Sequence, residues 1–60
     1  MCEFKVFLDG EKVAEDVIYA KVEGHTVTLR DIIGRPIVLD SVKIVEVDVV
    51  STRLVLSHTK

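Results

Sequence analysis

Apolar and polar residues alternate along most of the chain, beginning close to the amino terminus. In residues 2–8 the even positions are all apolar or cysteine, whereas the odd positions include Glu3 and Lys5. A period of two places successive side chains on opposite faces of an extended strand. Asp9-Gly10 follows directly and is a strong hairpin signal. The sequence therefore predicts a strand at 2–8 that turns back on itself.

The alternation continues to the carboxyl terminus in segments separated by turn residues. After the hairpin we expect a short strand at 12–14 and a charged turn at Glu15-Asp16. Longer strands are predicted at 17–23, 26–30, 37–42, 43–50 and 53–57. Between the second and third of these, one helical or 3₁₀ turn could run from Asp31 to Gly34. Five or six short strands at this spacing favour an all-β fold, a small antiparallel SH3/Sm-like barrel.

The apolar parity of each predicted strand defines a hydrophobic core. Its expected members are Phe4, Val6, Leu8, Ile18, Val22, Val27, Leu29, Val45, Val47, Leu54 and Leu56. An unpaired charge buried at one of these positions costs more than a domain this small can bear. We therefore expect Val47→Asp to unfold the chain.

Composition supports strands and limits size. The 60 residues include 12 Val and 5 Ile against 2 Ala, and β-branched residues favour strands over helices. A chain of this length buries only roughly 60% of its unfolded surface, which leaves room for one small domain spanning 1–60. It is too short for a catalytic scaffold with inserted loops. No nucleotide-binding loop, nucleophile elbow or HExxH motif occurs, so we expect no enzyme activity and no catalytic residues.

Charge and targeting features narrow the partners. Eight Lys and Arg face ten Asp and Glu, and aromatic residues are 5% with no Trp, which disfavours nucleic-acid binding. A single cysteine cannot form an intramolecular disulfide, and neither a signal peptide nor an apolar run of ~20 residues is visible. We expect a cytoplasmic protein without a membrane segment. Outward apolar residues suggest a stabilising homodimer; they are Phe7, Tyr19, Val50 and Val55.

Cys2 is the candidate functional residue. As a small hydrophobe it could extend the apolar face of the first strand into the core. Alternatively, the terminal amine, the amide nitrogen of residue 2 and the thiolate could close two adjoining chelate rings around one metal ion. Without Met1, the amine and thiolate of Cys2 would form one such ring. These donors suit Ni(II), and two termini in a symmetric dimer would complete the site. His25 is expected to be an exposed turn residue, and His58 a surface residue or weak metal ligand.

Seven segments of the chain resemble the CooT family of small nickel-binding proteins. They are MCEFKVFL (1–8), EDV (15–17), VEG (22–24), VTLRD (27–31), Gly34, IVEVDVV (44–50) and RLVL (53–56). The resemblance implies a dimeric Sm- or SH3-like barrel with Cys2 as nickel ligand. It also implies an accessory role in maturing a nickel enzyme, carbon monoxide dehydrogenase. The family's older label is predicted RNA-binding protein, and Glu3-Phe4 replaces its usual small or apolar pair.

The sequence therefore leaves two candidate functions. The first is a nickel-binding accessory protein with Cys2 from each of two protomers as ligand. The alternative is an Sm-like module that binds RNA or a protein without metal. Its cationic contacts would be Lys5, Lys21, Arg30 and Lys43.

Overall fold

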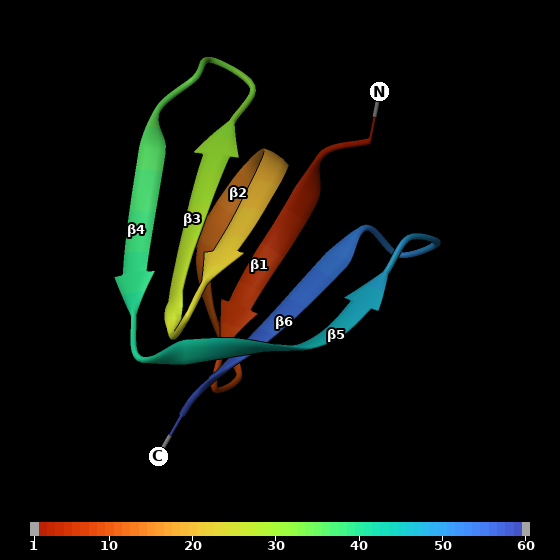
Figure 1. The fold of residues 1–60 in the computed structure, drawn as a ribbon. Coiled ribbons are helices and arrows are strands. Elements are labelled where there is room, and N and C mark those ends of the chain that lie inside the picture. Colours follow the sequence, from red (N-terminus) through yellow and green to blue (C-terminus); the bar gives the residue numbers. More distant parts are fainter. Residues whose placement is uncertain (1, 60) are drawn as a thin grey trace.

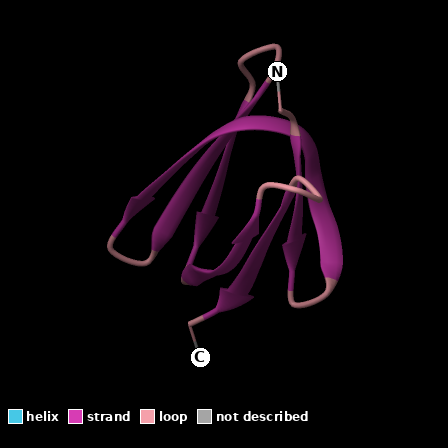
Figure 2. Ribbon diagram, turned by 90° about the vertical axis from the view of Figure 1, so that its right-hand side faces the viewer, coloured by secondary structure: helices cyan, strands magenta, loops and turns pink. Residues whose placement is uncertain are grey.

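The computed structural model describes residues 2–59, which form six strands (Figure 1). In chain order these are β1 (Phe4–Leu8), β2 (Glu11–Glu23), β3 (Thr26–Asp31), β4 (Pro36–Asp40), β5 (Val42–Asp48) and β6 (Arg53–His58). The described residues contain no helix, as Figure 2 shows, and hence none that could span a membrane. The all-β prediction with six strands is confirmed.

The strands form one curled sheet in the order β4-β3-β2-β1-β6-β5. Neighbouring strands are antiparallel except β1 and β6, which run parallel. The Val42 N–H donates to the His25 carbonyl over 3.0 Å, and this bond joins the start of β5 to the turn between β2 and β3. From the corner between them, β4 and β5 diverge (Figure 1). These two edge strands do not pair, so the barrel stays open.

Strand β2 is one long bent strand, and the expected charged turn at residues 15–16 is wrong. Its first part pairs with β1 and its second part with β3. Asp16 has φ +57°, a left-handed conformation that aspartate tolerates better than most residues. The ladder also shifts register between Val17 and Tyr19, which leaves Ile18 as an extra residue. The kink and bulge bend β2 and rotate its side chains without reversing the chain.

The hydrophobic core contains much of the predicted set. Its buried members are Val6, Val17, Val27, Leu29, Val42, Leu54 and Leu56, with Phe4, Leu8, Ala14, Ile37 and Leu39 packed against them. Four predicted core residues are wrong, being 45–58% exposed: Ile18, Val22, Val45 and Val47. Ile18 and Val45 lie where bulges interrupt the alternation. Val22 and Val47 do face inward, opposite buried Val27 and Leu54, but the open sheet leaves them uncovered.

The turn after β3 is built around a buried carboxylate. Asp31 is 4% exposed, and its Oδ1 accepts hydrogen bonds from the N–H groups of Ile33 and Arg35 at 3.0 Å each. Its Oδ2 accepts one from Arg35 Nε at 2.8 Å. The Gly34 N–H donates to the Asp31 carbonyl, and Gly34 has φ +86°. The turn therefore begins and ends where the sequence predicts, as a single β-turn whose i→i+3 hydrogen bond matches the 3₁₀ alternative and not an α-helical turn.

Candidate functional site

Cys2 lies in solvent just before β1. Its thiol is free and exposed, so Cys2 does not continue the apolar face of β1 into the core. The interpretation of Cys2 as a small buried hydrophobe is therefore wrong. An exposed thiol is accessible to a metal ion or a reactive partner.

The turn between β5 and β6 lies beside the beginning of β1. The Lys5 N–H donates to the Thr52 carbonyl over 2.9 Å, and Lys5 is in parallel register with Arg53. This turn carries two exposed valines at its tip: Val49 is 62% exposed and Val50 is 98% exposed. Cys2 therefore shares its end of the molecule with an apolar protrusion.

The histidines lie away from Cys2. Cys2 precedes the start of β1, whereas the His58 ring contacts the carboxylate of Asp9, which follows the end of β1. That hydrogen bond lowers the pKa of Asp9 below its usual value, while slight desolvation opposes the shift. His25 lies in the exposed turn that the sequence predicts. Within residues 2–59 no three His, Cys, Asp or Glu side chains gather as a metal-binding group.

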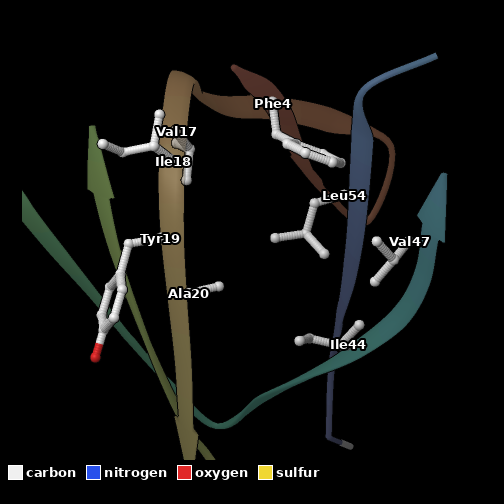
Figure 3. A pocket seen from close by; sticks show the side chains of 8 residues that line it. All are labelled: Phe4, Val17, Ile18, Tyr19, Ala20, Ile44, Val47 and Leu54. Atoms are coloured by element: carbon white, nitrogen blue, oxygen red, sulfur yellow. The ribbon is translucent and has the colours of Figure 1, made fainter. Parts of the chain in front are cut away.

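An apolar groove opens between β2 and β5. Its volume is about 190 Å³, and its lining consists of Phe4, Val17, Ile18, Tyr19, Ala20, Ile44, Val47 and Leu54. Figure 3 shows Phe4 and Leu54 directed toward the space between the two strands, with Ala20 facing them from β2. We call the space lined by these eight residues the apolar groove. Phe4 is two residues from Cys2, so the groove extends toward the same end of the molecule.

The sequence pattern does not predict this groove, although it holds a signal for it. Residues 17–20 are apolar on both parities, which conflicts with a strand that has one solvated face. Alternation therefore cannot assign these residues to one face. The bulge at Ile18 and the open edge decide which of them line the groove.

The cations proposed for an RNA surface come from four strands. Lys5 lies on β1, Lys21 on β2, Arg30 on β3 and Lys43 on β5. Lys21 Nζ lies 3.6 Å from a carboxylate oxygen of Glu23, and the Arg30 guanidinium packs 4.4 Å from the centre of the Tyr19 ring. Two of the four thus already have partners within the chain, which weakens an RNA-binding surface.

The chain matches one family model over residues 1–57, nearly its whole length. The family is described as CO dehydrogenase accessory protein CooT. A search of curated proteins finds no match. The family match confirms the resemblance carried by the sequence segments and gives the chain a CO dehydrogenase accessory role.

Proposed function

This chain belongs to the CooT family of CO dehydrogenase accessory proteins, and from that premise we propose that it binds Ni(II) through Cys2 at a homodimer interface. The nickel would be cargo for the maturation of a nickel enzyme such as CO dehydrogenase. The protein would act in the cytoplasm as a carrier and not as a catalyst. The exposed thiol of Cys2 is the observation that carries the proposal.

The donor chemistry at the amino terminus suits nickel. Cys2 is the chain's one thiol, and thiolate with amine or amide nitrogen is a donor set that Ni(II) accepts. One terminus offers too few donors to hold the ion against competing ligands. Two termini related by a two-fold axis would supply two thiolates and their adjacent nitrogens. Glu3 adds a negative charge next to the thiol that favours a cation.

Exposed apolar side chains support the homodimer. Val50 and Tyr19, two of the four outward residues in the dimer prediction, are 98% and 38% exposed, whereas Phe7 and Val55 are half-buried. Among residues 2–59, twelve large hydrophobic residues are exposed, an unusual number for so small a chain. A second protomer that covers part of this surface would bring equivalent positions together near the axis.

A nickel titration tests the metal role. Reduced protein at neutral pH should bind one Ni(II) per two chains, with a thiolate-to-nickel charge-transfer band in the near ultraviolet. Cys2→Ser should abolish the band and weaken binding by at least about 100-fold, because the only thiolate donor is lost. Circular dichroism should be unchanged, since Cys2 is exposed.

A double variant is the matched control. His25→Ala with His58→Ala removes the other nitrogen side chains that bind transition metals and should leave the nickel affinity unchanged. Equal affinity of Cys2→Ser and the parent would refute the proposal. Binding should also weaken in acid, because protons compete with nickel for the thiolate and the nitrogens.

The alternative function, an Sm-like module that binds RNA or a protein without metal, has less support. Lys21 and Arg30 have partners within the chain, and the four proposed cations are spread over four strands. Salt-sensitive RNA binding that Cys2→Ser leaves intact would favour this alternative.

A further inference from the structure

The turn between β1 and β2 holds a sequence that can modify itself. Asp9-Gly10 is the one Asp-Gly pair of the chain, which contains no Asn. In such a pair the amide nitrogen of the glycine can attack the side-chain carboxyl carbon of the aspartate, because glycine has no Cβ to shield the nitrogen. Three of the other four aspartates precede a β-branched Val or Ile, and the fourth precedes Ser41. The sequence therefore makes Asp9 the aspartate best suited to this reaction.

The fold leaves both reacting groups accessible. Asp9 and Gly10 have φ of +51° and +87°, and they connect Leu8 to its cross-strand partner Glu11. The Asp9 side chain is 48% exposed. Within residues 2–59, no residue other than the two chain neighbours of Gly10 has an atom within 4 Å of the position that a Cβ would occupy there. No distant side chain therefore covers Gly10, and water reaches the Asp9 carboxyl.

A single side-chain contact holds the Asp9 carboxylate. The His58 ring nitrogen Nδ1 is hydrogen-bonded to Asp9 Oδ2, and His58 is the last residue of β6. Rotation of the carboxyl toward the Gly10 nitrogen breaks this hydrogen bond. The same bond lowers the pKa of Asp9, and an ionised carboxylate is a poorer electrophile than a neutral carboxyl. The His58 ring therefore opposes the reaction in two ways.

We propose that Asp9-Gly10 is a site of spontaneous isomerisation to isoaspartate, and that the His58 ring restrains the reaction by holding the Asp9 carboxylate. The Gly10 nitrogen forms a bond to Asp9 Cγ, and the hydroxyl of the neutral carboxyl leaves with the amide proton as water. The product is a five-membered succinimide. Water then opens the ring at either carbonyl. Opening at Cγ restores aspartate, whereas opening at the former backbone carbonyl gives isoaspartate.

Isomerisation changes the turn and its link to β6. The main chain becomes longer by one carbon, and the former backbone carbonyl becomes a free carboxylate. The present turn fits the Leu8–Glu11 pair, and the Asp9 N–H donates to the Leu56 carbonyl over 3.1 Å. Both interactions depend on the length of the turn, so the modified chain loses them. The new carboxylate is a substrate for the class of methyltransferase that recognises isoaspartyl groups. This site lies at the end opposite Cys2 and does not depend on the proposed nickel role.

Peptide mapping tests the site on the full chain, stored reduced in neutral buffer for several weeks. Trypsin cuts after Lys5 and Lys12 and releases residues 6–12, which include Asp9. This peptide should divide into two chromatographic forms of equal mass, and an isoaspartyl methyltransferase should methylate only the new form. Asp9→Glu should give no second form, because glutamate would have to close a less favourable six-membered ring.

His58 variants test the restraint. His58→Ala should raise the rate of isoaspartate formation at Asp9 by about threefold or more, the factor expected for losing one hydrogen bond to a charged group. His58→Asn should restore part of the restraint, because its side-chain amide can donate from the position of Nδ1. His25→Ala is the matched control, since it removes the other histidine, and it should leave the rate unchanged. Both histidines are exposed, so every variant should keep the parental circular dichroism.

The Asp40-Ser41 pair is an internal reference for general loosening of the chain. It lies in another exposed turn, where Asp40 Oδ1 accepts a hydrogen bond from the Thr26 hydroxyl over 3.0 Å. Acceleration at Asp9 alone in His58→Ala supports the restraint. Equal acceleration at Asp9 and Asp40, or a parental rate at Asp9, would overturn it. Absence of the second form from both the parent and His58→Ala would overturn the site itself.

Discussion

At the scale of single residues, Asp31 and Cys2 show opposite relations between sequence and surroundings. Cys2 occupies one of the alternating apolar positions of residues 2–8 and is nevertheless exposed, whereas the carboxylate of Asp31 is buried. Burial opposes ionisation of Asp31, but hydrogen bonds from the Arg35 N–H, the Arg35 side chain and the Ile33 N–H outweigh it and lower its pKa. The charge is thus retained because the turn itself supplies donors.

The lowered pKa makes stability depend on pH. The unfolded chain titrates Asp31 near the usual value of about 3.9, and the folded chain titrates it lower. The contribution of ionised Asp31 to the free energy of unfolding is therefore fully present above about pH 4. It is lost as the pH falls through the pKa of Asp31 in the folded chain. Urea unfolding midpoints should drop between pH 5 and pH 2.5.

Asp31→Asn isolates the contribution of this carboxylate. The variant should be less stable than the parent at pH 5 and should lose less stability on acidification, because it lacks the titrating group. Asp9, Glu15 and Asp48 also have lowered pKa values but are more exposed, so a smaller acid dependence should remain. An undiminished acid dependence in Asp31→Asn would contradict the assigned role.

At the scale of elements, bulges decide which side chains of β2 and β5 are buried. In β5 the register shifts between Ile44 and Glu46, so Val45 is an extra residue. Val42, before the bulge, is 2% exposed, whereas Val47, after it, is 57% exposed. One strand therefore has a buried beginning and a second half that lines the open groove.

Two aspartate substitutions in β5 test this division. Val42→Asp buries an unpaired charge, which costs several kcal/mol and should leave the chain unfolded. Val47→Asp should fold with parental circular dichroism because its side chain reaches water, which corrects the outcome expected from the sequence. An unfolded, monomeric Val47→Asp variant would show that the groove is covered within the single chain.

At the scale of the whole molecule, the two ends differ in polarity and closure. The end opposite Cys2 carries polar turns that backbone hydrogen bonds connect. The Val42 N–H donates to the His25 carbonyl, and the Thr59 N–H donates to the Ser41 carbonyl. The Cys2 end has the exposed residues Val49 and Val50, and the apolar groove runs from Phe4 at this end toward Ile44. A partner that covers the open end would complete the core that one chain leaves partly exposed.

The proposed homodimer predicts a thermal stability that depends on protein concentration. Each tenfold increase in concentration stabilises a folded dimer by about 1.4 kcal/mol relative to two unfolded chains. For 120 residues in two chains this should raise Tm by about 5 °C. Calorimetry from micromolar to submillimolar protein measures the shift. A Tm that stays constant over this range would indicate a monomer.

The sequence by itself determined the all-β class, most strand positions, the turn from Asp31 to Gly34, and five of the seven buried core residues. These features depend on the alternation of apolar and polar residues and on the residues that favour turns, and both signals are local in the sequence. Only the tertiary structure decided the bend of β2, the bulges at Ile18 and Val45, and the exposure of Val47. These features follow from the pairing of strands distant in the sequence and from a sheet edge that remains open. A local hydrophobic period predicts neither the pairing nor the open edge.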